Sequence, residues 1–247
     1  MRLYLVRHAQ SINNVLMLVT NSRRDRNPDP LLSDLGREQV RYLSQYLRDA
    51  VEPDEDTWID PQDHKGFEFT HIYCSLMLRA VETGSAISKA LNVPLIGWRD
   101  LHETGGIVSG DGAETPYIGL PGSTQSFFRE NYPELVLCDR FGDEGWWNRP
   151  HEEVSEHQPR AKRVVDTLLE KHGGTSDRVL VVTHGAFYNH LMQELLGLED
   201  ERVMFGWSNT AITRWDFHQE DGKDTYRGRV LVYSNRIDHL PKHLVTM

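Results

Sequence analysis

Residues 178–185, RVLVVTHG, decide the fold of this chain, because a continuous apolar run here ends on a histidine and a glycine. A short apolar run of this kind predicts a buried β-strand. Similar runs occur at LYLV (residues 3–6) and THIYC (residues 70–74), and each is followed by a segment with helical spacing. Buried strands that alternate with helices predict a three-layer α/β/α sandwich around a mostly parallel central sheet.

The same periodicities place the other elements. The further predicted strands are 93–96, 210–217 and 229–235, and the predicted helices are 11–19, a segment that opens at Ser33, 77–91, 153–172 and 186–196. Residues 52–68 are acidic and contain proline, which predicts a surface excursion. No linker divides the chain, so we expect one domain over residues 1–247. Within it, glycine, proline and aromatic residues with weak periodicity predict a lid or specificity insertion at about 104–160.

Composition narrows the classes of function. The formal net charge is −10, which argues against a nucleic-acid partner because such proteins present a basic surface. No apolar run approaches the ~20 residues that span a bilayer, so no membrane partner is expected. Two cysteines, Cys74 and Cys138, give neither a disulfide framework nor a paired zinc spacing. The default expectation is therefore a cytoplasmic protein.

Charged side chains follow the three strongest strand signals. Arg7 and His8 end the first run, Arg79 lies one helical turn beyond the second, and His184 ends the third. Ligands of open α/β sheets bind at the carboxyl ends of parallel strands. If these strands are parallel, two guanidinium and two imidazole groups meet there, and the helix N-termini that follow add N–H donors. The pattern predicts an anion site.

Six motifs resemble those of the histidine phosphatase superfamily, branch 1, which includes the phosphoglycerate mutases. In chain order they are RHAQS with Asn14 (7–14), LLSDLGREQ (31–39), YCSLMLRAVET (73–83), LHETGG (101–106), VVTHGAF (181–187) and NTAI (209–212). The resemblance implies a phosphoglycerate mutase-like fold and a phosphomonoester hydrolase that forms a phosphohistidine. It implies neither a cofactor nor a metal.

The resemblance also implies roles for individual residues. His8 is the nucleophile, Glu103 the general acid and base, and His184 a donor, charged or neutral, to the phosphoryl oxygens. The implied phosphate-binding residues are Arg7, Asn14, Arg79, His184 and Thr210. For Glu103, a plain carboxylate at a helix N-terminus or on the surface is the competing interpretation. Repulsion from Arg7 and Arg79 is expected to lower the pKa of His8 and keep it neutral.

Two positions depart from the family pattern. Ala9 stands where glycine is usual, so we expect an ordinary backbone φ there. The mutase element R-H-Y-G after the acidic residue is absent, and TGGI (104–107) stands instead, which favours a hydrolase. A primer-dependent mutase and a catalytically silent phosphate-binding scaffold remain alternatives. The substrate is expected to be a small phosphorylated molecule, with a phosphoprotein possible. The roles of Arg23, Arg24 and Arg26 and the oligomeric state stay open.

Overall fold

The computed structural model describes residues 1–22, 24–49, 63, 66–138, 141–198, 203–218 and 228–247. Its central sheet has the strand order β6-β3-β2-β7-β1-β8-β9. The strands are β1 Arg2–Arg7, β2 His71–Cys74, β3 Leu95–Gly97, β6 Leu135–Leu137, β7 Arg178–Thr183, β8 Ile212–Phe217 and β9 Arg229–Arg236. The five strands from β6 to β1 are parallel, while β8 and β9 are antiparallel to their neighbours. The predicted mostly parallel sheet is confirmed.

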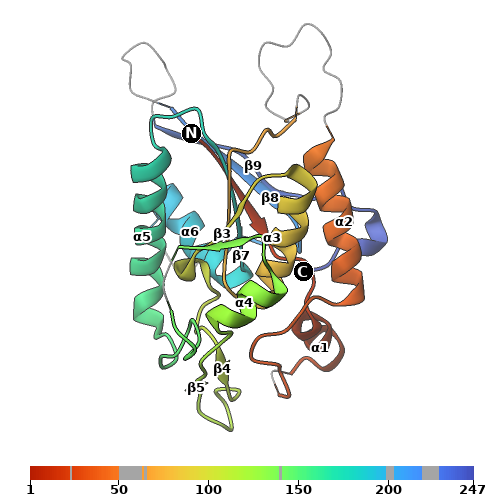
Figure 1. Cartoon of the computed structure of the whole chain (residues 1–247), viewed down its shortest axis with the longest axis vertical. Coiled ribbons are helices and arrows are strands. Elements are labelled where there is room, and N and C mark those ends of the chain that lie inside the picture. Colours follow the sequence, from red (N-terminus) through yellow and green to blue (C-terminus); the bar gives the residue numbers. More distant parts are fainter. Residues whose placement is uncertain (23, 50–62, 64–65, 139–140, 199–202, 219–227) are drawn as a thin grey trace, which may run out of the picture.

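Helices cover both faces of this sheet (Figure 1). They are α1 Ile12–Thr20, α2 Asp34–Arg48, α3 Leu78–Leu91, α4 Gln125–Asn131, α5 Val154–His172 and α6 Gly185–Leu196. Side chains alternate along each strand, so β7 sends Leu180 and Val182 toward α2, α3 and α4, and Val179 and Val181 toward α5 and α6. Each face therefore buries its own apolar cluster, as a three-layer α/β/α sandwich requires.

The segment predicted as an insertion contributes directly to the core. Strand β6 pairs in parallel with β3 and forms an edge of the central sheet. Phe128, Trp146 and Trp147 are buried in the same apolar cluster as α3. The part that stands apart is the two-stranded β4 (Val108–Ser109) and β5 (Ile118–Gly119), at the end of the molecule that also carries α1 (Figure 1). Weak periodicity in the sequence hid β6 because the strand is only three residues long.

The predicted surface excursion at 52–68 lies mostly outside the described residues, and its described end is buried. Asp63 is 5% exposed, and its carboxylate accepts hydrogen bonds from the hydroxyls of Tyr4 and Tyr233 and from the guanidinium of Arg214. Phe67 packs in the core cluster. For these two residues the prediction of a surface position was wrong, because the acidic composition of the segment does not reveal partners supplied by β1, β8 and β9.

Within the part of the chain that the structure describes, none of the helices combines the length and the apolar character needed to cross a bilayer.

Candidate active site

His8 lies directly after β1 and is buried, at 3% exposure. Its Nδ1 is 2.7 Å from the carbonyl oxygen of Ala9, which only accepts, so Nδ1 carries the proton. Its Nε2 lies 3.2 Å from Nε of Arg79, which only donates, so Nε2 presents a lone pair. The two contacts define one neutral tautomer whose unprotonated nitrogen points to the arginine.

Electrostatics hold His8 in this neutral form. Burial lowers its pKa well below the usual value, and the charges of Arg79 and Arg7 act in the same direction. The predicted effect of the two arginines is thus confirmed, with burial as the larger cause. Ala9 is not among the described residues with positive φ, so the ordinary backbone expected there is also confirmed.

Two arginines, Arg79 buried and Arg7 half-buried, bring positive charge to the same edge of the sheet. Arg79, in the first turn of α3, is 9% exposed, and burial lowers its pKa. Arg7 ends β1 and donates to the carbonyl of Trp207, while its Nε has no hydrogen-bond partner among the described residues. A Cβ at Gly185 would lie 3.4 Å from Cζ of Arg7, so this guanidinium reaches the start of α6. Desolvated cations with a spare donor are suited to an anionic ligand.

His184 is the N-cap residue of α6 and is fully buried. Its ring centroid is 5.1 Å from that of His8, with the planes tilted by 54°. Neither ring nitrogen has a partner among the described residues. Burial, Arg79 and His8 all lower its pKa, which favours the neutral donor over the charged form. A buried imidazole with no protein partner beside a second imidazole marks a place where a polar ligand binds.

Glu103 caps helix α6 from another part of the chain. Its Oε1 accepts from the backbone N–H groups of Thr104 and Phe187, both at 2.9 Å, and its Oε2 accepts from Ala186 at 3.1 Å. This is the competing interpretation, a carboxylate at a helix N-terminus, where negative charge is stabilised. The carboxylate nevertheless lies within the field of Arg7 and Arg79, whose pKa values it raises against the effect of burial. The general acid role stays a prediction.

Several backbone N–H groups at the helix N-termini, which the sequence predicts as donors to an anion, already donate to side chains of the protein. Glu103 accepts from two N–H groups of α6, and Asp29 Oδ1 accepts from the N–H of Leu78 in α3 at 2.9 Å. In α1, the hydroxyl of Ser11 accepts from the N–H of Asn14. Side chains have already satisfied these groups, so the guanidinium and imidazole groups remain as the principal donors to an anion.

Sequence reasoning missed a buried ion pair that holds the segment carrying Glu103. Arg160 is 0% exposed and bonds both carboxylate oxygens of Glu152, at 2.6 and 2.8 Å. Its third nitrogen donates to the carbonyls of Asp100 and His102, at 2.7 and 2.9 Å. Glu152 also accepts from the N–H of Gly105. The pair thereby fixes the backbone on both sides of Glu103. No motif links these residues, since Arg160 lies within a helix that reads as amphipathic.

Asp29 is a further residue that the sequence did not reveal. Its Oδ1 caps α3, whereas its Oδ2 is buried without a partner among the described residues. Burial raises its pKa to about 7, and the nearby charge of Arg79 opposes that shift. Asp29 therefore changes its charge near neutral pH beside one of the two site arginines. The sequence NPDP indicated only a loop.

The remaining predicted residues have other partners. Asn14 forms a capping box with Ser11, through Oδ1 and its own N–H. Thr210 donates its N–H to the carbonyl of Arg7, and its hydroxyl lies 3.0 Å from Nε2 of His239. Their phosphate-binding roles stay predictions, and the hydroxyl and N–H of Thr210 are both engaged. Arg24 forms an exposed ion pair with Glu114 of the β4–β5 hairpin.

Of the other two loop arginines, Arg26 lies close enough to Arg79 for its charge to act with burial in lowering the pKa of that residue. Arg23 lies outside the described residues.

Comparison with known proteins agrees with this geometry. The family model of the histidine phosphatase superfamily (branch 1) matches residues 61–225, about two-thirds of the chain. No curated protein matches in sequence. Among solved structures, YhfR of Bacillus stearothermophilus has a TM-score of 0.59 and 20% identity, covering 96% of this chain and 98% of its own. The mycobacterial glucosyl-3-phosphoglycerate phosphatase has a TM-score of 0.59 and 22% identity, covering 95% and 98%. Phosphoserine phosphatase of Entamoeba histolytica has a TM-score of 0.58 and 17% identity, covering 97% and 99%.

The fold is that of a phosphoglycerate mutase-like α/β protein, with a cluster of cationic and imidazole side chains at the carboxyl edge of its sheet. The chain belongs to the histidine phosphatase superfamily, branch 1. The matched region includes Arg79, Glu103 and His184, and it begins after Arg7 and His8. His8 contacts Arg79 and His184 of the matched region directly, and Arg7 donates to the carbonyl of Trp207 within it.

Proposed function

We propose that this protein hydrolyses phosphomonoesters through a phosphohistidine formed on His8. The observation that carries the proposal is the tautomer of His8, whose lone pair on Nε2 lies in a buried cluster of cations and neutral donors. A neutral imidazole is a nucleophile, whereas imidazolium is not. Arg7, Arg79 and His184 supply donors for the three oxygens of the transferred group.

The reaction then has two balanced steps. In the first, the Nε2 lone pair of His8 attacks phosphorus, the bond from phosphorus to the ester oxygen breaks, and Glu103 gives that oxygen a proton. In the second, water attacks phosphorus while Glu103 takes a proton from it. The P–N bond breaks, inorganic phosphate leaves, and the lone pair returns to Nε2. Splitting the transfer in this way replaces one difficult step by two easier ones.

Glu103 would serve the two steps in different protonation states. As a carboxylate it accepts hydrogen bonds from three backbone N–H groups, and this form is the base that the second step requires. The first step requires the carboxylic acid, which gives its proton to the departing ester oxygen. We infer that substrate binding itself prepares the acid, and that Arg160 and Glu152 keep the carboxyl group in place while its charge changes.

The substrate class that we propose is a small phosphorylated molecule, with a phosphoprotein as the alternative. Structural neighbours are named for phosphatases of phosphoserine, glucosyl-3-phosphoglycerate and α-ribazole, so the shared fold accommodates chemically different leaving groups. The β4–β5 hairpin, which Arg24 joins to the loop after α1, is the proposed specificity element. We further propose that the reaction needs no metal and no cofactor. Cys74 and Cys138 are both free, which suits the proposed cytoplasmic location.

A hydrolysis screen over phosphomonoesters, run with and without 2,3-bisphosphoglycerate and with a chelator, tests the proposal. We expect phosphate release that requires no primer and continues in the chelator. The wild-type protein should yield acid-labile phosphate on His8 after rapid quenching, and His8→Ala should yield none. Full turnover by His8→Ala would rule out this nucleophile, and strict dependence on the bisphosphate would favour the mutase alternative.

A further inference from the structure

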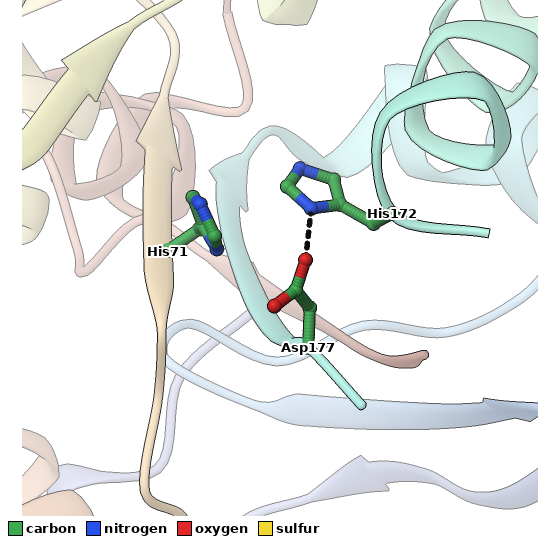
Figure 2. Close-up of side chains that lie close together, drawn as sticks. All are labelled: His71, His172 and Asp177. Atoms are coloured by element: carbon green, nitrogen blue, oxygen red, sulfur yellow. Dashed lines mark hydrogen bonds and ion pairs between the residues drawn. The ribbon is translucent and has the colours of Figure 1, made fainter. Parts of the chain in front are cut away.

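A second cluster of histidine and carboxylate side chains lies at the amino edge of the central sheet. His71 begins β2, His172 ends α5, and Asp177 immediately precedes β7 (Figure 2). One potential ligand atom from each of the three lies within 4.8 Å of the others. Strand β7 separates Asp177 from His184, and six residues at about 3.3 Å each place the two clusters on the order of 20 Å apart. The cluster is therefore separate from the candidate active site.

Local structure holds two of these residues in a fixed relation. The Nδ1 of His172 lies 2.8 Å from Oδ2 of Asp177 (Figure 2). The short connection between them is braced by Thr175, whose N–H and hydroxyl both donate to the carbonyl of His172. The hydroxyl of Thr175 also accepts from the N–H of Asp177 at 3.0 Å. Because the backbone between the residues is held, the imidazole and the carboxylate are already oriented toward each other.

The sheet register fixes the third residue. His71 is paired with Val179, two residues beyond Asp177, in the parallel ladder of β2 and β7. The N–H of Thr70 donates to the carbonyl of Arg178 at 2.9 Å, which anchors the start of β2. The ring centroid of His71 is 4.5 Å from that of His172. The position of His71 thus depends on the sheet pairing and not on a flexible loop.

Each of the two histidines has one ring nitrogen close to a hydroxyl group, as a metal-bound histidine has on the ring nitrogen that does not bind the metal. Tyr73 places its hydroxyl 3.0 Å from Nε2 of His172, so this nitrogen already has a partner when Nδ1 bonds a cation. Such an outer contact fixes the ring orientation of metal ligands. His71 has a comparable contact, since its Nδ1 lies 2.9 Å from the hydroxyl of Thr70. Its Nε2 has no recorded partner among the described residues.

We propose that His71, His172 and Asp177 form a binding site for a divalent transition-metal ion of the Zn²⁺ type. Two imidazoles and one carboxylate suit such an ion, and water completes the coordination. Bonds of 2.0–2.2 Å place tetrahedral ligand atoms about 3.4 Å apart, so the ion replaces the proton between His172 and Asp177, which move apart from 2.8 Å, while the half-buried His71 rotates toward them. Asp177 is also accessible, which gives the ion a path from solvent. The ion would tie β2, α5 and β7 together and stabilise the native state.

Titration with ZnCl₂, followed by calorimetry and thermal unfolding of the metal-free full-length protein, tests this site. Wild-type protein should bind the ion and unfold about 5 °C or more higher at a hundredfold excess over Kd. His71→Ala and Asp177→Asn should each bind one equivalent fewer and lose that rise. His243→Ala, which removes an exposed histidine elsewhere, is the matched control and should behave like the wild type.

Three results would overturn the proposal: no binding by the wild type at 100 µM ZnCl₂, equal binding by His71→Ala, or equal loss in His243→Ala. Because Asp177→Asn preserves side-chain shape, and His71→Ala removes a half-buried ring whose hydrogen bond within the described part of the chain is to its neighbour Thr70, both variants are expected to fold. Circular dichroism of the metal-free variants checks this directly. Turnover by these variants should equal that of the wild type, so the result is independent of the function proposed for His8.

Discussion

Both edges of the central sheet carry histidine and carboxylate side chains, but in opposite electrostatic surroundings. At the carboxyl edge, His8 and His184 lie among Arg7 and Arg79, and Glu103 bonds to backbone N–H groups instead of to an imidazole. At the amino edge, Asp177 bonds directly to His172. Burial, reinforced by the nearby arginine charges, lowers the pKa of both histidines of the first pair and keeps them neutral, which suits an anion, whereas the carboxylate of Asp177 makes the second cluster suited to a cation. The chemistry of a histidine therefore follows from its charged neighbours.

The largest expected contrast is between His8→Asn and His71→Asn. Loss of the nucleophile should lower kcat by about 10³-fold or more, since no other group replaces the covalent step. The change at the amino edge should leave kcat within about twofold of wild type. Steady-state hydrolysis of p-nitrophenyl phosphate measures both. If kcat fell by a comparable factor in the two variants, both edges of the sheet would contribute to turnover, and the distinction drawn between them would be wrong.

Glu103→Gln should lower kcat far more for substrates with poor leaving groups than for substrates with good ones. Alkyl phosphates need a proton on the departing oxygen, so their kcat should fall by about 10²–10⁴-fold. Nitrophenolate leaves without assistance, and its release should fall less than tenfold. The comparison uses the ratio of the two losses in one enzyme preparation, with Asp177→Asn as the control at the other edge. Equal losses for both substrates would leave Glu103 as a helix cap alone.

Arg160→Met probes the buried ion pair that holds the segment of Glu103. Removal of one partner leaves Glu152 charged in the interior, which should cost about 3–5 kcal/mol in the free energy of unfolding. Adding Glu152→Gln should recover part of that loss, because a neutral amide is less costly to bury unpaired. Urea unfolding of the single and double variants measures this. A single variant as stable as the wild type would contradict the role given to the pair.

Asp29 should make the native state less stable as the pH rises through neutrality. Its folded pKa of about 7 exceeds the unfolded value of 3.8, so the native state keeps a proton that the unfolded chain has released. Between these values, stability falls by up to about 1.4 kcal/mol per pH unit. Asp29→Asn keeps the cap on α3 and does not titrate. The free energy of unfolding of this variant, relative to that of the wild type, should therefore increase between pH 5 and pH 8. If the two free energies changed with pH in the same way, the prediction would be refuted.

Asp177 should affect the pH dependence of stability in the opposite direction to Asp29, and by the smallest amount of the changes considered. Its hydrogen bond with His172 lowers its pKa, so its contribution to stability is present above the unfolded value of 3.8 and is lost as the pH falls through the folded pKa. The carboxylate is partly exposed, so Asp177→Asn should cost less than about 1 kcal/mol at pH 7 without metal. Unfolding measured at pH 7 and pH 3 should show that this difference disappears in acid. If the difference in free energy of unfolding between the variant and the wild type persisted at pH 3, it would come from packing and not from the charge of Asp177.

Much of the fold could be predicted because the signals are local. Apolar runs located β1, β2 and β7 to within two residues, and helical spacing located α2 and α5. Elements that the sequence did not predict, and surface positions that it predicted wrongly, have partners that are distant in sequence. Strand β6 is short and is defined by its pairing with β3, and Phe67 is buried by side chains from other strands. Composition alone could reveal neither.

The candidate site divides in the same way. Arg7, His8, Arg79 and His184 each follow a recognisable strand, so one topological rule brought them together. Asp29 and the pair of Arg160 and Glu152 lie in a loop and a helix without a motif. Their roles depend on which backbone groups they meet after folding. The cluster of His71, His172 and Asp177 was invisible for the same reason, because about a hundred residues separate its first two members.

The sequence by itself determined the order of strands and helices, the family, and the group of cationic residues at the carboxyl ends of the strands. These follow from periodicity and motif, which are properties of neighbouring residues. Only the tertiary structure decided the tautomer of His8, the backbone groups that Glu103 caps and the charge of Asp29, because burial and distant partners set the hydrogen bonds or the pKa of each group. RVLVVTHG thus predicted where the candidate site lies, and packing around its His184 decided that this histidine is neutral.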